Sequence, residues 1–219
     1  MSLPMHKERR LLYANQLLLT LSIALLILTA FIPAPLQNFV SAFLLTGIFL
    51  TSIYVGGSSS PRLIAVVVLL VVLQWVAHVI EREYLALMTA ALNSIYILYL
   101  VVRMAIQFSS AQRVTTNTLL IAVNGYLLIG LTCALYALLI AHLAPDSFYV
   151  ARENAFLSAD TQFHTFAYYA FINMSTVGFG DIIPVTNAGR ALAVLLAVTG
   201  PLYIAIVIAF LVGKYAGGK

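Results

Sequence analysis

Residues 175–181 read STVGFGD, and they stand between two very apolar parts of the chain. The stretch contains two glycines, a hydroxyl group and a carboxylate, and it predicts neither a helix nor a strand. Irregular backbone at membrane depth is tolerated only where protein or a water-filled path satisfies its polar groups. Gly178 and Gly180 accept backbone dihedrals that are costly for other residues, and they alternate with large apolar residues. This alternation predicts that successive carbonyls, extended by the Thr176 hydroxyl, form one edge of a cation-binding column.

The composition around this stretch suits lipid rather than water. Of the 219 residues, 63% are hydrophobic and 8% are charged, and the mean hydropathy is +1.03. A soluble domain carries roughly 25% charged residues, so the composition indicates an integral membrane protein. The basic residues flank apolar segments and form no patch for nucleic acid. The lone cysteine, Cys133, cannot form a disulfide within the chain and is expected to be a small buried hydrophobe.

Six apolar segments are long enough to cross a bilayer, whose hydrocarbon core requires about 20 helical residues. They are separated by turn-forming residues such as proline, glycine and serine. The predicted spans are 11–32, 36–55, 63–80, 84–108, 119–143 and 188–215.

A shorter helix is predicted immediately before the STVGFGD stretch. Residues 161–174 (TQFHTFAYYAFINM) are aromatic and compatible with a helix, and Asp160 is a candidate N-cap. At about 1.5 Å per residue this helix measures about 21 Å, which is too short to cross the membrane. We therefore expect a re-entrant helix that enters the membrane and stops.

The distribution of charge predicts the orientation. With the amino terminus in the cytoplasm, basic residues are more numerous on the inner side and acidic residues on the outer side. This places both termini in the cytoplasm, and an acidic outer face would raise the local concentration of cations. The inner basic residues are Lys7, Arg9, Arg10, Arg62, Arg103, Arg113, Lys214 and Lys219, and the outer ones are Arg82, Arg152 and Arg190.

STVGFGD resembles the selectivity filter of potassium channels, whose pattern is T-V-G-[Y/F]-G-D. The similarity extends over residues 119–219, since a short helix precedes the motif, Pro184 follows it, Gly189-Arg190 opens the last span and Gly200 falls at the usual place of a hinge glycine. The resemblance implies an all-α membrane protein with six transmembrane helices, a re-entrant pore helix (161–174), a filter loop (175–181) and an inner helix (188–215). It also implies a homotetrameric channel in the cell membrane.

The resemblance assigns roles residue by residue. Asp181 would sit at the outer mouth and accept a hydrogen bond from Tyr168, while the side chains of Val177 and Phe179 would pack on the re-entrant helix. The implied ion-binding residues are Thr176, Val177, Gly178, Phe179 and Gly180, with potassium at the first four, and the implied supporting residues are Ser175, Asp181, Tyr168 and Tyr169. No other cofactor is expected.

Two positions depart from the family pattern. Ile172 stands where some two-helix members carry a glutamate that pairs with the filter aspartate, and Phe179 lacks the hydroxyl of a tyrosine. Both departures put filter-based inactivation in question, whereas the ion-coordinating backbone is unaffected.

The last span carries the predicted gating elements. Gly200-Pro201 predicts a break, because proline removes one backbone hydrogen bond and clashes with the carbonyl of Ala197. We interpret the break as a gating hinge, the alternative being a fixed kink beside a permanently open cavity. Apolar side chains below it would face the axis as a gate that closes by dewetting, or would only pack the bundle. They are Ile204, Ile208, Leu211, Val212 and Tyr215.

The division of the chain follows from these segments. Residues 1–108 resemble a voltage-sensor domain without gating charges, 109–118 form a short cytoplasmic linker, and 119–219 form the pore domain. The fourth span has one basic residue, Arg103, and one charge crossing 100 mV contributes only about 2.3 kcal/mol. We therefore expect no steep voltage dependence. The short linker favours packing of the four-helix unit beside the pore helices of its own chain.

Isolated polar residues within the spans are read as packing contacts between helices. These residues are Gln16, Gln74, His78, Asn93, Ser94 and Asn124. His164 lies on the predicted outer side and is a candidate sensor of external pH.

The sequence therefore predicts a potassium channel that conducts passively, with copies of the same chain and membrane lipids as its partners. Two alternatives within the same superfamily are a weakly selective cation channel and a subunit of a potassium-uptake transporter. An inert membrane scaffold is a third. An enzyme is disfavoured, because no nucleophile–base or metal cluster is evident.

Overall fold

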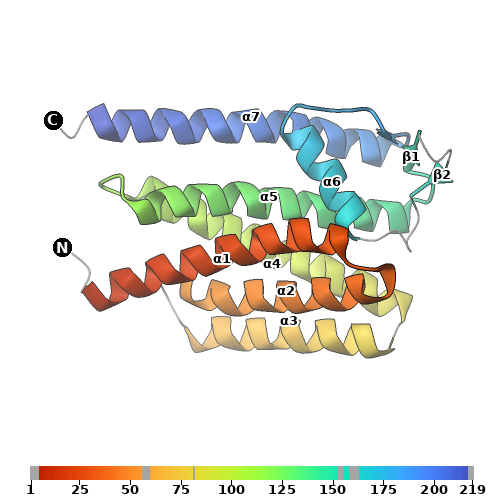
Figure 1. Cartoon of the computed structure of the whole chain (residues 1–219), viewed down its shortest axis with the longest axis horizontal. Coiled ribbons are helices and arrows are strands. Elements are labelled where there is room, and N and C mark those ends of the chain that lie inside the picture. Colours follow the sequence, from red (N-terminus) through yellow and green to blue (C-terminus); the bar gives the residue numbers. More distant parts are fainter. Residues whose placement is uncertain (1–4, 56–59, 81, 152–154, 158–162, 217–219) are drawn as a thin grey trace.

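The computed structural model describes residues 5–55, 60–80, 82–151, 155–157 and 163–216. Five long helices, a short one and a further long one follow one another, with three short strands near the short helix (Figure 1). The elements are α1 (Met5–Phe31), α2 (Ala34–Val55), α3 (Pro61–Ile80), α4 (Glu83–Ser109), α5 (Thr116–Leu143), β1 (Phe148–Val150), β2 (Ala155–Phe156), α6 (Phe163–Met174), β3 (Ile182–Pro184) and α7 (Asn187–Ala216).

Proline and capping residues determine several helix boundaries. Pro33 follows the end of α1, because the residue before a proline is disfavoured in the helical region. Pro61 opens α3, at the position where the missing amide hydrogen is not needed. Thr115 caps α5: the Thr118 amide donates to the Thr115 hydroxyl at 3.2 Å, and the Thr115 amide donates to the Thr118 hydroxyl at 3.3 Å.

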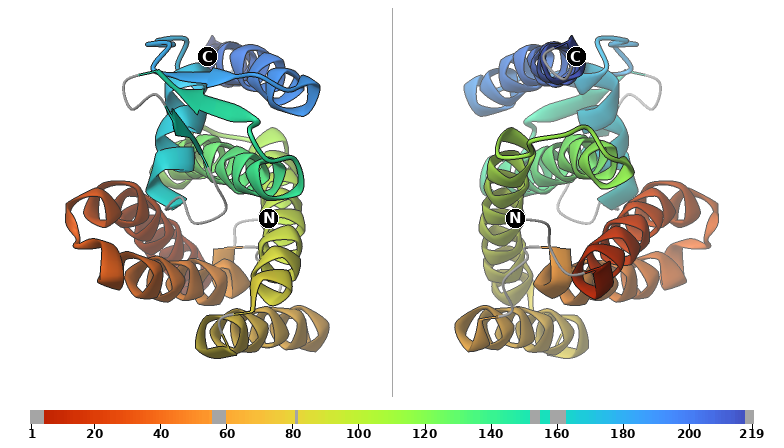
Figure 2. Two further views of the ribbon diagram at one scale, coloured as in Figure 1. Left: turned by 90° about the vertical axis from the view of Figure 1, so that its right-hand side faces the viewer. Right: turned by 90° about the vertical axis from the view of Figure 1, so that its left-hand side faces the viewer.

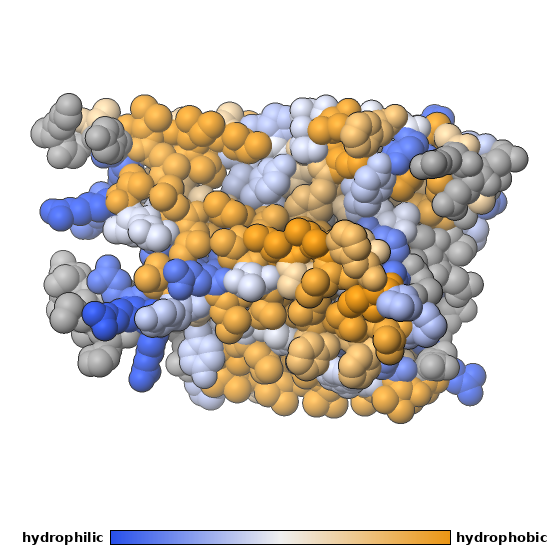
Figure 3. All heavy atoms as spheres, viewed as in Figure 1, coloured by the Kyte–Doolittle hydropathy of each residue, from blue (hydrophilic) through white to orange (hydrophobic). Residues whose placement is uncertain are grey.

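Six of the helices that the structure describes are long and apolar enough to cross a membrane, namely α1–α5 and α7. They coincide with the six predicted segments to within a few residues, except at the start of α1. Hydrophobic residues cover the middle of the molecule, and hydrophilic residues gather toward its two ends (Figure 3). α6 has 12 residues, about 18 Å of helix, which is too short to cross. The predicted cap Asp160 and the first two residues of the predicted 161–174 helix lie outside the described residues.

α5 occupies the centre of the fold. It packs against α1 and α4 on one side and against α6 and α7 on the other (Figure 2). One cluster of buried apolar residues joins α1–α4 to α5, and a second joins α5 to β1, α6 and α7. Cys133 belongs to the second cluster and is 5% exposed, as expected for a small buried hydrophobe. The four-helix unit therefore lies beside α5 of its own chain.

Polar groups between α2, α3 and α4 form interhelical hydrogen bonds. Gln74 donates to the carbonyl of Ala42 at 2.7 Å, and Asn93 donates to the Gln74 side-chain oxygen at 3.3 Å. These contacts confirm the packing role predicted for both residues. Ser94 instead donates to Ala90 of its own helix at 2.7 Å. The ring of His78 packs against aromatic rings of α2 and α3.

A second polar contact joins α1 to α5. Asn124 donates to the backbone oxygen of Asn15 at 2.9 Å, and Asn15 donates to the side-chain oxygen of Asn117 at 2.8 Å. Asn15 and Asn124 are fully buried, whereas Gln16 is exposed. The prediction for Asn124 is thus confirmed, but that for Gln16 is wrong, because the neighbouring Asn15 occupies the buried face of α1.

A small antiparallel sheet lies at the end of the molecule opposite the last turn of α7 (Figure 1). Its strand order is β2-β1-β3, so β1 is central and pairs Tyr149 with both Phe156 and Ile183. Residues 144–160, which contain β1 and β2, are polar and rich in turn-forming residues, and no strand was predicted among them. Strands of two or three residues are too short for their alternation to be recognised, and β3 is distant from β1 in the chain. Pro184 ends an edge strand, where its missing donor is tolerated.

Candidate ion-conduction site

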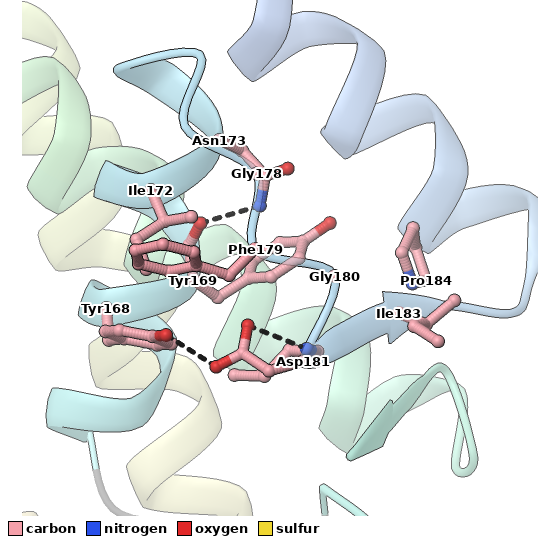
Figure 4. Close-up of a pocket in the computed structure, with 11 residues that line it drawn as sticks. Tyr168, Tyr169, Ile172, Asn173, Gly178, Phe179, Gly180, Asp181, Ile183 and Pro184 are labelled. Atoms are coloured by element: carbon pink, nitrogen blue, oxygen red, sulfur yellow. Dashed lines mark hydrogen bonds between the residues drawn. The ribbon is translucent and has the colours of Figure 1, made fainter. Parts of the chain in front are cut away.

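The first half of the 175–181 loop is fastened to the last turn of α6. The amides of residues 175, 176, 177 and 178 donate to carbonyls of residues 171–173 at 2.9, 3.1, 3.1 and 3.3 Å. Both Val177 and Gly178 use the carbonyl of Ile172, and Figure 4 shows the second of these bonds. The loop therefore continues α6 as a turn before it becomes extended.

The sign of φ alternates along the loop. Thr176, Gly178 and Gly180 have φ of 63°, 51° and 72°, and outside the loop only Asp146 of the described residues has positive φ. The two glycines behave as predicted, whereas Thr176 was not expected in the left-handed region, where a β-branched residue is a rare outlier. The alternation is the backbone pattern expected of the predicted carbonyl column, since the left-handed region is available to glycine at two of the three positions.

The loop has an open face in the single chain. Residues 175–180 are exposed, and the side chains of Val177 and Phe179 are 54% and 71% exposed. α6 of the same chain therefore covers only part of the two side chains that were expected to pack on it. A Cβ atom added at Gly178 or Gly180 would meet no atom within 4 Å.

Asp181 ends the loop and is held from three directions. Its carboxylate accepts hydrogen bonds from the Tyr168 hydroxyl at 2.5 Å and from the amide of Ile182 at 3.1 Å (Figure 4). Its backbone oxygen accepts from the amide of Ala151 at 2.9 Å. The predicted Tyr168–Asp181 hydrogen bond is thus present. Burial, together with the bond to Asp181 and its negative charge, raises the pKa of Tyr168 to about 12, so the hydroxyl remains a donor at neutral pH.

A cavity of about 170 Å³ lies between α6 and the loop (Figure 4). Its lining includes Tyr169, Ile172, Asn173 and Phe179. The Tyr169 ring is 2% exposed, and its hydroxyl has no hydrogen-bond partner in the part of the chain that the structure describes. Burial raises the pKa of Tyr169 to about 12. Ile172 contributes an apolar side chain to this lining, at the position where a pairing glutamate is absent.

Gly200 contacts the end of α6. α7 is helical throughout Gly200-Pro201, so Pro201 does not interrupt the helix, and the gating hinge stays a prediction. A Cβ atom at Gly200 would lie 1.8 Å from the carbonyl oxygen of Met174 and 2.7 Å from its carbonyl carbon. Glycine is required here because the backbone of α6 approaches α7 directly, just before the loop begins.

The candidate gate residues of α7 differ in exposure. Ile204, Ile208 and Val212, spaced four residues apart, are 46%, 54% and 61% exposed. Leu211 instead packs with Phe210 against the core cluster that joins the four-helix unit to α5. Leu211 therefore follows the alternative in which these side chains only pack the bundle, and here the packing is within its own chain. The side chain of Tyr215 lies outside the described residues.

His164 lies on α6 beside a second, larger cavity of about 530 Å³. The cavity is also lined by residues of α1 and by Tyr168 and Asp181. Burial lowers the pKa of His164, so the imidazole is neutral at pH 7 and acquires its proton only below its ordinary range. No group of three or more His, Cys, Asp or Glu residues suited to a metal ion occurs within the described ranges.

Sequence reasoning missed three backbone contacts around the loop. Ala151 and Ser147 belong to the segment that was read as turns, and Met174 was read only as the end of a helix. Their contributions come from main-chain groups whose partners are distant in the chain, so residue type carries no signal. Arg152, Glu153 and Asp160, assigned to the outer charged face, lie outside the described residues.

Comparison with known families indicates what this part of the chain is similar to. Residues 137–216 match a family model described as an ion channel. The match spans the end of α5, the sheet, α6, the loop and α7, and it leaves α1–α4 outside. No match was found among curated proteins or among solved structures. The region that contains the STVGFGD loop is therefore similar to an ion-channel domain, within a chain whose long apolar helices are typical of a membrane protein.

Proposed function

We propose that this chain is one subunit of a homotetrameric, potassium-selective channel that conducts passively across the cell membrane. The observation that carries the proposal is the alternation of φ at Thr176, Gly178 and Gly180 in an exposed loop at the end of a short helix. The ion-channel match over residues 137–216 supports it independently.

Carbonyl oxygens perform the chemistry in this mechanism. Those of residues 176–179, with the Thr176 hydroxyl, replace the water shell of a potassium ion, as in potassium channels. One chain supplies one edge of the column, and four chains around an axis supply rings. α6 acts as the re-entrant pore helix, and its carboxyl-terminal end, next to Met174, carries a partial negative charge that favours a cation in the central cavity.

Assembly as a tetramer would cover the surface that a single chain leaves open. α7 is the least buried of the long helices that the structure describes, and its exposed side chains are apolar along most of its length. Val177 and Phe179 add further exposed apolar surface beside the loop. These faces would line the central cavity or contact neighbouring subunits.

The other helices complete the proposed arrangement. Residues 1–108 form a four-helix unit, 109–118 a linker and 119–219 the pore, and each unit lies beside the pore helices of its own subunit, as the packing of α1 and α4 on α5 suggests. The first turn of α1 and the last turn of α7 lie at the same end of the molecule, opposite the sheet (Figure 1). With cytoplasmic termini, the sheet and Asp181 lie at the extracellular mouth.

A flux assay tests the proposal. Purified protein in liposomes is expected to pass potassium in strong preference to sodium and to be blocked by barium. Gly180→Ala tests the mechanism sharply, because an added Cβ meets no atom of its own chain, so the positive φ is what opposes it within the chain. Left-handed backbone costs alanine about 1–2 kcal/mol per residue, and selective flux should be lost.

The matched control is Gly213→Ala, at a helical site with open space and no positive φ, which should conduct like the parent chain. Equal passage of sodium and potassium by the parent protein would instead support the weakly selective channel. A monomer in the bilayer would contradict the proposal.

A further inference from the structure

The loop is held at both ends by hydrogen bonds, at its start by α6 and at its end by the residue that follows strand β1. The inner anchor is α6, which receives hydrogen bonds from the amides of residues 175–178. Among the described residues no backbone bond is formed by Phe179 or Gly180, and Gly180 has open space around it. The next fastened group is Asp181, which is bound by Tyr168 and by the amide of Ala151.

The bond from Ala151 extends the β1–β3 ladder to the end of the loop. Val150 pairs with Ile182 in this ladder, so Ala151 stands opposite Asp181 and donates to its carbonyl oxygen at 2.9 Å. The bond from Ala151 restricts the direction of the Asp181 carbonyl. Strand β1 therefore fastens the chain directly after Phe179 and Gly180, the two loop residues without a backbone hydrogen bond.

Strand β1 is itself connected to both long helices of the pore region through Ser147, which is fully buried. The Ser147 hydroxyl donates to Ala144 at the end of α5 and accepts from the Thr186 hydroxyl at 2.9 Å. Its carbonyl accepts from the amide of Val185 at 2.8 Å. Thr186 in turn accepts from the amide of Gly189 in the first turn of α7 at 3.3 Å.

We propose that β1, anchored at Ser147 and acting through Ala151, is the positioning strand of the filter. It holds the carbonyl of Asp181 through the hydrogen bond from Ala151. Phe179 and Gly180 are thereby kept extended between α6 and Asp181, so that their alternating φ values are retained when ions leave. The inference rests on the proposed channel function and adds to it the part of the chain that determines selectivity at the outer mouth.

The test removes one donor without changing a side chain. Replacing the Ala151 amide by an ester, with lactic acid incorporated at this position of the full chain, deletes the N–H that binds Asp181. The permeability ratio of potassium to sodium is expected to fall about fivefold, the effect of losing one ordinary hydrogen bond, and the current is expected to decay during maintained conduction at low external potassium. A purely structural role would reduce the number of channels and leave the ratio unchanged.

The matched control is an ester at Leu157, whose amide donates to Phe148 at 2.8 Å within the same sheet but does not reach the loop. The Leu157 ester should leave the potassium-to-sodium permeability ratio and the decay of the current as they are in the parent protein. A second pair consists of side-chain variants. Thr186→Val removes the hydroxyl that binds Ser147 and should also lower the permeability ratio. Thr186→Ser retains the hydroxyl and should keep the ratio of the parent protein.

These experiments distinguish failure of the proposed channel function from failure of the positioning role of β1. Absence of selective flux in the parent protein would refute the channel function itself. A selective parent whose Ala151 ester and Thr186→Val variants keep its ratio and its steady current would overturn the positioning role alone. If the ester chain fails to assemble, the Thr186 pair decides.

Discussion

Two adjacent tyrosines on α6 have opposite hydrogen-bonding environments. The Tyr168 hydroxyl donates to Asp181, while the Tyr169 hydroxyl is buried without a partner in the described part of the chain. A hydrogen bond to a charged group contributes more than a neutral one, and a buried group without a partner contributes nothing favourable. The same substitution at the two positions therefore isolates the contribution of the hydroxyl at Asp181.

Tyr168→Phe is expected to destabilise the assembled protein by about 1 kcal/mol, because the partly exposed carboxylate loses a donor. Tyr169→Phe should be neutral or slightly stabilising. Thermal unfolding in detergent measures both.

The pH dependence of the Tyr168 effect provides a further check. The pKa of Tyr168 is raised from 10.0 to about 12, so its contribution is complete below pH 10 and is lost as the pH rises toward 12. The difference between parent and Tyr168→Phe should accordingly be constant from pH 6 to pH 9, within the working range of the assay. A larger effect at Tyr169 would mean that its hydroxyl acquires a partner in the assembled protein.

Gly200 has no room for a side chain, because the backbone of Met174 lies against it. Gly200→Ala places a methyl group against the Met174 backbone, which cannot move as a flexible side chain would. We expect a loss of about 3 kcal/mol, near the upper end of ordinary overpacking. Thermal unfolding of Gly200→Ala, with Gly213→Ala as the control, measures this loss. A stable Gly200→Ala protein with altered gating alone would support the hinge interpretation.

At the scale of elements, α7 makes different contacts along its length. Gly200 contacts α6, and Phe210 and Leu211 pack against the four-helix unit and α5. Ile204, Ile208 and Val212 are exposed. Phe210 also lies 4.5 Å from Phe108 of α4, between ring centroids. This exposed stripe is the one that we propose to face a central axis in a tetramer.

Ile208→Asn is expected to raise the resting conductance several-fold, because a polar side chain in a hydrophobic constriction favours its wetting. Ile206→Asn is the control, since Ile206 is similarly exposed, at 58% against 54%, but lies on another face of α7. Single-channel recording at rest measures the effect. Equal effects of the two variants would remove Ile208 from the gate.

The elements also show what the sequence can predict. Long apolar segments located the six helices that are long enough to cross a membrane, and the glycine spacing located the loop, because both signals are local. The sheet was missed, since its strands have two or three residues and β1 pairs with β3 across more than 30 positions. α7 stays helical at Pro201 because neighbouring structure can compensate for one missing helical bond. The contact of Gly200 with Met174 was missed because its partner is distant in the chain. Thr176 was missed because its positive φ opposes its residue type.

At the scale of the whole molecule, α5 belongs to both halves. The Asn15–Asn124 contact lies between α1 and α5, with both side chains fully buried. Interhelical polar contacts of this kind contribute about 0.6 kcal/mol on average in membrane proteins. The four-helix unit is thereby joined to the pore region by a specific contact as well as by apolar packing.

Asn15→Ala should destabilise the protein by about 1 kcal/mol, because it removes a buried amide and leaves a small void. Gln16→Ala, at the exposed neighbouring position, should change stability by less than about 0.5 kcal/mol. Thermal unfolding of the two variants in the same detergent compares them. Equal losses would show that the buried contact contributes nothing specific.

The charge distribution of α4 predicts the electrical behaviour of the molecule. Its single arginine, Arg103, lies near the carboxyl end and donates to the Tyr99 hydroxyl at 3.0 Å. Full transfer of four such charges across 100 mV would contribute only about 9 kcal/mol, at 2.3 kcal/mol each, and the end of a helix travels much less. Patch-clamp recording should show a shallow conductance–voltage relation, and a steep sigmoid would contradict this prediction.

The contact of Gly200 with the Met174 carbonyl has a thermodynamic consequence. If occupancy of the filter by ions stabilises the end of α6, it must favour the position of α7 that preserves this contact, and a shift of α7 must change ion affinity by the same factor. Ion binding in the loop and the position of α7 would then influence each other. The external potassium concentration would thereby change how often the channel opens, without a separate sensor.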